Sequence, residues 1–248
     1  MPVDPQIQAL LNIGTGVPAT HTLSVDVARV HYEARIALMA PPADIAGVRE
    51  HTIDGPGGAL RLRIYTPHGT GPFPLLVFFH GSGFVLCSLD THDGMCRNLC
   101  AGAGCVVASV DYRLAPEHKF PAGPEDCLHA TRWAGMHAVE LGADPTRIAV
   151  AGDSAGGNMA AVTAIRVRDE GGPALCGQLL LYPVGLPHAR HSFIRAERRG
   201  VRPDPRYDEV VLGPLSARPV GRHAPARLAA ARPESVRLAA RPRHHRRI

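Results

Sequence analysis

The sequence lacks any run of about 18 or more apolar residues, the length that a helix needs to cross a bilayer. Residues 1–5, Met-Pro-Val-Asp-Pro, lack the basic start and the apolar stretch of a signal peptide. The six cysteines form no Cys-x-x-Cys pair, which disfavours a zinc ribbon and a thiol redox motif. We therefore expect a soluble, cytoplasmic protein whose cysteines are ordinary half-buried thiols.

Lysine and aromatic residues are scarce where positive charge is concentrated. The formal net charge of +5 combines two unlike segments: residues 1–185 carry a net −5, and residues 186–248 carry a net +10 from 15 arginines against 5 acids. The second segment has no lysine, two aromatic residues and 8 prolines. This composition is typical of a disordered basic tail. Its arginines would bind phosphate, but without lysines and stacking aromatics we expect no nucleic-acid partner.

The 248 residues, 45% of them apolar, are enough for one large α/β domain with a substantial core. Residues 5–11 and 24–38 are amphipathic with helical spacing, and residues 49–66 alternate with period two around a glycine-rich turn, which predicts an antiparallel hairpin. From residue 74 onward, continuous apolar runs alternate with helical stretches, which is typical of a parallel sheet covered on both faces. The predicted strands are 75–79, 105–110, 148–151 and 178–181, and the predicted helices are 92–101, 124–141 and 155–170.

The strongest chemical signal is the segment Gly152-Asp153-Ser154-Ala155-Gly156, which lies between a predicted buried strand and an alanine-rich helix. A Gly-x-Ser-x-Gly turn in this context is a nucleophile elbow, and its glycines avoid collisions between the strained turn and its neighbours. Ser154 is therefore the candidate nucleophile. The amide of Ala155, at the start of the helix, is a candidate donor to an oxyanion.

A second signal, His80-Gly81-Ser82-Gly83-Phe84, follows the first strong parallel strand. Small residues here allow backbone N–H groups to approach a substrate carbonyl, and a hydrolase with such an elbow takes the rest of its oxyanion hole from this loop. No second histidine or cysteine stands at ligand spacing near His80, so no metal is expected. The supporting motif residues are His80, Gly81, Gly152, Asp153, Gly156 and Gly157.

These two motifs, with the segment from Asp111 to Glu117 (Asp-Tyr-Arg-Leu-Ala-Pro-Glu) between them, resemble the hormone-sensitive-lipase branch of the α/β-hydrolases over about residues 20 to 185. The resemblance implies a mostly parallel sheet with an N-terminal antiparallel hairpin, and carboxylesterase activity on small esters through Ser154. It also implies oxyanion donors at the amides of Ser82, Gly83 and Ala155. The resemblance also implies a helical cap, and together with the composition this divides the chain into a helical cap (1–45), a partial core (46–185) and the basic tail (186–248). We further interpret Asp111, Arg113 and Glu117 as residues that pair to brace the loop behind the elbow, with ordinary surface salt bridges as the alternative.

An activated serine also requires a histidine and a carboxylate, which follow later strands in this fold. The later candidates all lie in the basic tail, where we expect no scaffold to orient them: Asp204, Asp208, Glu209, His223, His244 and His245. The expectation is that the C-terminal strands are missing and that activity is impaired. We hypothesise that residues from about 185 onward are a frameshifted product, because codons chosen for residues 197–215 encode a hydrolase-like segment when shifted by one base.

The leading interpretation is thus a serine carboxylic ester hydrolase that needs no cofactor. A homodimer is left open. One alternative is a non-catalytic ligand-binding member of the same fold, as in the plant gibberellin receptor. Another is a peptidase or acyltransferase, because these enzymes share the elbow.

Overall fold

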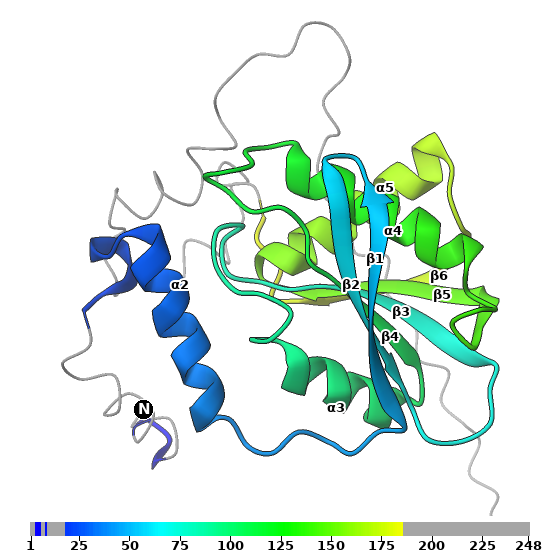
Figure 1. The fold of residues 1–248 in the computed structure, drawn as a ribbon, viewed down its shortest axis with the longest axis horizontal. Helices are drawn as coiled ribbons and strands as arrows, with labels where there is room; N and C mark the ends of the chain where they lie inside the picture. The colour runs from blue at the N-terminus through cyan, green and yellow to red at the C-terminus, as the bar shows by residue number, and fades with distance from the viewer. Residues whose placement is uncertain (1–2, 6–7, 9–17, 186–248) are drawn as a thin grey trace, which may run out of the picture.

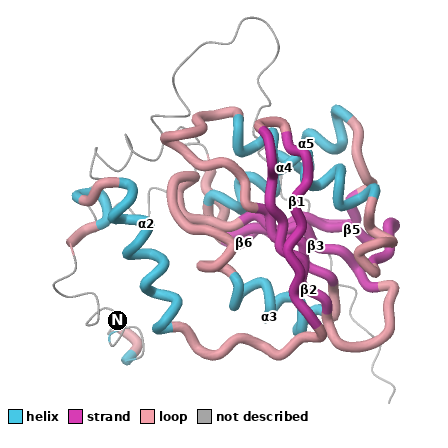
Figure 2. The backbone as a smooth tube through the Cα atoms, in the orientation of Figure 1, coloured by secondary structure: helices cyan, strands magenta, loops and turns pink. Residues whose placement is uncertain are grey.

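A computed structural model describes residues 3–5, 8 and 18–185 of the chain. The predicted basic tail at 186–248, including the expected loss of C-terminal strands, therefore lies outside the described residues, as does the predicted helix at 5–11 apart from residues 5 and 8. In the described part, the chain forms a six-stranded sheet with helices around it (Figures 1 and 2).

The sheet has the strand order β1-β2-β4-β3-β5-β6. The N-terminal hairpin pairs β1 (Gly47–Gly55) with β2 (Gly58–Thr66), and β2 runs antiparallel to β4 (Val106–Val110). The other pairs are parallel, with β3 (Phe73–Phe79) between β4 and β5 (Ala143–Asp153), and β6 (Leu175–Leu181) beside β5. The prediction of a mostly parallel sheet with an antiparallel N-terminal hairpin is confirmed.

The period-two geometry of strands divides the buried residues between two cores. In β3, Leu75, Val77 and Phe79 pack on the face covered by α4 (Ala122–Met136) and α5 (Ala155–Glu170). Leu76 and Phe78 point to the opposite face, where α3 (Asp93–Ala103) contributes Cys96 and Cys100. Figure 1 shows α3 on one side of the sheet and α4 and α5 on the other. Because both faces are covered, the central strands are continuous apolar runs.

The observed bounds of some strands and helices differ from the predicted ones. A strand is longer than predicted where its ladder hydrogen bonds continue beyond the apolar run in the sequence. The ladder extends β3 to Phe73, which pairs with Ala143 of β5. The predicted helix at 124–141 ends at Met136, because the ψ angle of His137 is 13°, outside the helical region. The helix predicted at 155–170 matches α5.

The N-terminal helical segment comprises a 3-10 turn at Thr20–Thr22, α2 (Val25–Ala34) and a second 3-10 turn at Arg35–Leu38. It replaces the single helix predicted at 24–38. Ala28 is the buried residue of α2, whereas Val27 and Val30 are 44% and 62% exposed. Few side chains of this segment therefore enter the core.

Candidate active site

Ser154 occupies the sharp junction between β5 and α5. Its φ and ψ angles are 51° and −116°, a conformation that L-residues rarely adopt. Backbone hydrogen bonds hold the turn: the Ser154 amide donates to the Leu181 carbonyl at 2.8 Å, and the Ser154 carbonyl accepts from the Val184 amide at 3.1 Å. A serine keeps such a strained backbone only where contacts with its surroundings hold the backbone in place. The hydrogen bond to Leu181 of β6 is one of these contacts.

The glycines on either side of Ser154 pack directly against backbone. A Cβ atom at Gly152 would lie 2.3 Å from the carbonyl of Gly156, and one at Gly156 would lie 1.9 Å from the carbonyl oxygen of Phe79. Gly157 is also close packed, since a Cβ there would lie 3.1 Å from the Pro183 side chain. The elbow is thus pressed against the end of β3.

The loop that follows β3 lies against the elbow at Gly81. A Cβ atom at Gly81 would lie 2.2 Å from Oδ2 of Asp153 and 2.8 Å from its carbonyl oxygen. The next residues, Ser82, Gly83 and Phe84, have φ angles of 81°, 68° and 66°. The structure therefore brings the two segments with the candidate oxyanion donors into contact, although they lie about 70 residues apart in the sequence.

Ala155 is the first residue of α5 and is fully buried. The first amides of a helix have no acceptor within that helix, and the helix dipole gives them partial positive charge. The Ala155 amide therefore lies where a candidate oxyanion donor is expected, at the start of α5 and next to Ser154.

Sequence reasoning missed His92, which immediately precedes α3 and contacts the elbow. Its Nε2 atom lies 3.3 Å from Oδ1 of Asp153, and its Nδ1 atom lies 2.9 Å from the Thr91 hydroxyl. The Tyr182 hydroxyl donates to Oδ2 of Asp153 at 3.3 Å. Burial tends to raise the pKa of Asp153, but the His92 imidazole outweighs it, and the pKa lies below its ordinary value. No sequence motif marks this histidine.

His80 is fully buried and lies in the core rather than at an open site. Its ring stacks on Tyr112 with the centroids 4.5 Å apart, and the Tyr112 hydroxyl donates to the His80 carbonyl at 2.6 Å. Among the described residues, nothing hydrogen-bonds its Nε2 atom. Burial, reinforced by the charge of His92, lowers the pKa of His80 to about 4, so the ring is neutral near pH 7.

This buried histidine makes the fold acid-sensitive. The unfolded chain binds the proton near pH 6.5, whereas the folded chain binds it only near pH 4, so acidification between these values favours unfolding. Urea denaturation at pH 7 and at pH 4.5 measures how far the free energy of unfolding falls on acidification. We expect this fall to be about 2 kcal/mol larger in the wild type than in His80→Gln. The exposed His68→Gln is the control and should retain the wild-type dependence. Identical pH profiles for wild type and His80→Gln would contradict the assignment.

Asp111, Arg113 and Glu117 each form an ion pair, as the sequence predicts, and none of these pairs joins two of the three residues. Each residue pairs with a partner elsewhere in the fold, because the loop between β4 and α4 directs the three side chains to different elements. The pairs are Arg61 with Asp111 at 2.7 Å, Arg113 with Asp126 at 2.8 Å, and Arg29 with Glu117 at 2.8 Å.

The later acid and base candidates, at positions 204, 208, 209, 223, 244 and 245, lie outside the described residues. Within the described residues, no group of three or more His, Cys, Asp or Glu side chains is arranged to hold a metal ion. Over the same ranges, no helix combines the length and the hydropathy that a bilayer crossing requires.

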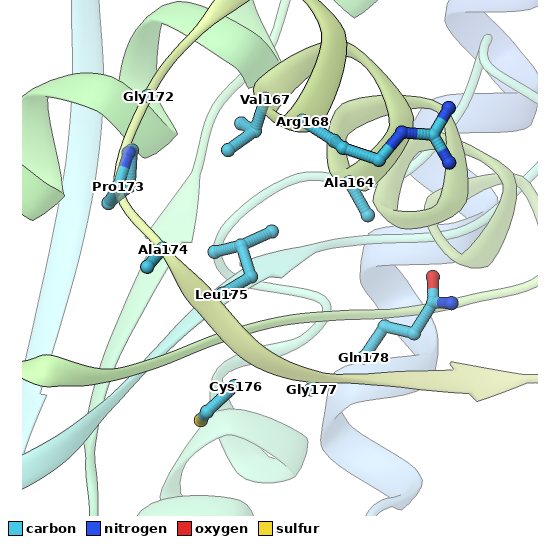
Figure 3. A pocket seen from close by; sticks show the side chains of 10 residues that line it. All are labelled: Ala164, Val167, Arg168, Gly172, Pro173, Ala174, Leu175, Cys176, Gly177 and Gln178. Carbon is cyan, nitrogen blue, oxygen red and sulfur yellow. The ribbon is translucent and has the colours of Figure 1, made fainter.

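A surface groove of about 510 Å³ lies between the C-terminal half of α5 and the start of β6 (Figure 3). Val167, Arg168 and Leu175 are among its lining residues, and the Cys176 side chain points away from α5. None of the candidate site residues lines this groove. It is therefore separate from the elbow.

Comparison with known proteins agrees with this geometry. A family model described as alpha/beta hydrolase fold matches residues 76–209. The chain is 48% identical over 181 residues to esterase LipI of Mycobacterium tuberculosis, covering 71% of this chain and 53% of that protein. It is 40% identical over 174 residues to an ethyl acetate hydrolase of Pseudomonas putida, covering 66% and 54% of the two chains.

Among solved structures, a hyperthermophilic esterase from the archaeon Pyrobaculum calidifontis superimposes with a TM-score of 0.74 at 42% identity, covering 84% of this chain and 66% of that one. The chain spans about half the length of the curated relatives it matches. The motifs, the sheet topology and these matches agree, and the chain belongs to the alpha/beta hydrolase fold family, in its hormone-sensitive-lipase-like carboxylesterase branch.

Proposed function

We propose that the chain is a carboxylic ester hydrolase that works through an acyl-enzyme on Ser154. The observation that carries this proposal is the contact between the elbow and the glycine loop after β3. Ser154, which has a positive φ angle, stands at the start of α5, and the neighbouring Asp153 packs against Gly81 of that loop. In this arrangement the Ser154 hydroxyl oxygen attacks an ester carbonyl, the carbonyl oxygen becomes negatively charged, and the alcohol leaves. The amides of Ser82, Gly83 and Ala155 are the proposed donors to that oxygen.

The proton of Ser154 must pass to a general base. We assign this role to neither of the histidines near the elbow. His80 is a weak base because burial lowers its pKa to about 4, and His92 directs its nitrogens to Asp153 and Thr91. The described surroundings of the elbow therefore supply no activating histidine, and the proposal includes impaired turnover by this chain.

The names of the relatives support small esters as substrates, since they include an esterase and an ethyl acetate hydrolase. We propose short to medium acyl chains, with the N-terminal helical segment acting as a cap over the acyl pocket. Four buried, free cysteines (Cys96, Cys100, Cys105 and Cys127) support a reducing compartment such as the cytoplasm.

Ester turnover tests the proposal directly. We expect p-nitrophenyl acetate to be hydrolysed with kcat/KM at least about tenfold above that for p-nitrophenyl decanoate, because a short pocket excludes added methylenes from the transition state. The measurement is release of p-nitrophenolate under initial-rate conditions. Binding of short esters without turnover would favour the non-catalytic alternative, and equal rates for both substrates would contradict the short pocket.

A further inference from the structure

Arg29 of α2 contacts two loops of the core through one guanidinium group. Its Nε atom donates to the Val85 carbonyl at 2.9 Å, and Nη2 donates to the Ala115 carbonyl at 3.1 Å. Nη1 and Nη2 also donate to the two carboxylate oxygens of Glu117, each at 2.8 Å. The bidentate geometry and the two added carbonyl acceptors use the planar fork of arginine, which lysine cannot reproduce.

The ion pair is charged over most of the pH scale. The hydrogen bonds from Arg29 lower the pKa of Glu117 to about 2. Since Ala28 is the buried residue of α2, the hydrophobic attachment of this helix to the core is small. Arg29 therefore provides a polar attachment where apolar packing is weak.

The loop that Arg29 contacts is the one with the candidate oxyanion donors. Ser82, Phe84 and Cys87 all have φ angles between 66° and 81°, a region that non-glycine residues avoid. A loop keeps such a strained backbone only when contacts with the rest of the fold hold it in place. Along the loop, the His80 carbonyl accepts from the Tyr112 hydroxyl, and the Phe84 carbonyl accepts from the Ala115 amide at 3.0 Å.

The Arg29 bond to Val85 completes this series of external contacts. The Val85 and Leu86 amides both donate to the Ser82 carbonyl, at 3.4 Å and 3.1 Å, so the turn that Arg29 holds begins at Ser82. Arg29 also joins Val85 to Ala115, which lies on the neighbouring loop. A displacement of the Val85 carbonyl would therefore be transmitted to the peptide groups of Ser82 and Gly83.

We propose that Arg29 is a positioning residue, which holds the loop at residues 82–87 in the geometry that stabilises the oxyanion. This inference rests on the proposed function. It assigns the N-terminal helical segment a role in catalysis as well as in covering the pocket. Since oxyanion donors act on the transition state more than on the bound ester, misplacing them lowers kcat more than it raises KM.

Hydrogen exchange measures the contact without reference to activity. In the full chain, we expect Arg29→Ala to speed amide exchange at residues 82–87 by about tenfold, the effect of losing one charge-assisted hydrogen bond. Glu117→Gln keeps both bonds from Arg29 to carbonyls, so exchange should stay within about threefold of wild type. Arg166→Ala is the matched control, because Arg166 makes a bidentate pair with Glu170 and a carbonyl bond to Pro124, away from the loop.

Kinetics then test the catalytic consequence. With p-nitrophenyl acetate, Arg29→Ala should lower kcat by about tenfold and change KM by less than about threefold, with partial recovery in Arg29→Lys. Arg166→Ala should retain the wild-type kcat.

Unchanged exchange at residues 82–87 in Arg29→Ala would overturn the proposal, and so would a fall in activity without faster exchange. A rise in KM alone would also overturn it, since that result indicates a cap that only binds substrate. A wild-type chain that hydrolyses no ester would instead refute the proposed function, and the exchange measurement would still decide whether Arg29 holds the loop.

Discussion

Ser154→Ala should abolish covalent labelling by a fluorophosphonate probe and reduce the ester hydrolysis of the wild-type chain to background. The physical reason is that the probe and the ester both react with the Ser154 hydroxyl oxygen. Intact-protein mass spectrometry measures the labelled fraction, and peptide mapping locates the adduct. We expect one adduct per wild-type chain, at Ser154.

A buried serine away from the elbow provides the control. The Ser109 hydroxyl in β4 has no hydrogen-bond partner among the described residues, so Ser109→Ala should fold normally and retain full labelling. Persistent labelling of Ser154→Ala would place the nucleophile elsewhere. A wild-type chain that remains unlabelled would contradict the acyl-enzyme itself.

Gly156→Ala should destabilise the fold by about 4 kcal/mol or more, among the largest effects of a single substitution. The added Cβ would lie 1.9 Å from the Phe79 carbonyl oxygen and 2.7 Å from that of His80. Neither atom can yield easily, because both belong to the backbone at the end of β3, a strand paired on both sides. Overpacking therefore outweighs the small gain in helix propensity that alanine brings at the start of α5.

Urea denaturation of Gly156→Ala beside Gly177→Ala measures this effect. Gly177 lies in β6, and a Cβ there would meet nothing within 4 Å. Since its backbone angles suit any residue, Gly177→Ala should change the free energy of unfolding by no more than about 0.5 kcal/mol, or stabilise the fold slightly. Similar stabilities for the two variants would show that the elbow can relax, contrary to the close contact between Gly156 and β3.

Much of the scaffold could be predicted because its signals are local. The apolar runs of β3 and β4 and the alternation in the β1–β2 hairpin each follow from burial on one or two faces of a sheet. The helix predicted at 155–170 has the observed bounds, because it begins at a turn that glycine marks on both sides. Where prediction erred, as at the end of α4, a backbone torsion at His137 decided the boundary and left no mark in the apolar pattern.

The contacts around the elbow were less accessible to prediction. His92 and Arg29 belong to no motif, and the acidic and basic residues of the segment from Asp111 to Glu117 could be paired in several ways. Glu117 found its partner 88 residues away in the sequence, and Asp111 found one 50 residues away. The charges in the sequence do not identify these partners, because a charged side chain can form an ion pair with any opposite charge that the fold brings close to it.

The sequence by itself determined the family, the strand-turn-helix at Ser154 and the need for glycine around it, because steric limits on a tight turn act between neighbouring residues. Only the tertiary structure decided that Gly81 rests on Asp153, that His92 pairs with that carboxylate, and that Arg29 holds the loop after β3. These contacts join segments that approach one another only once the sheet has assembled. Which segments become neighbours therefore depends on the order of the strands in the sheet.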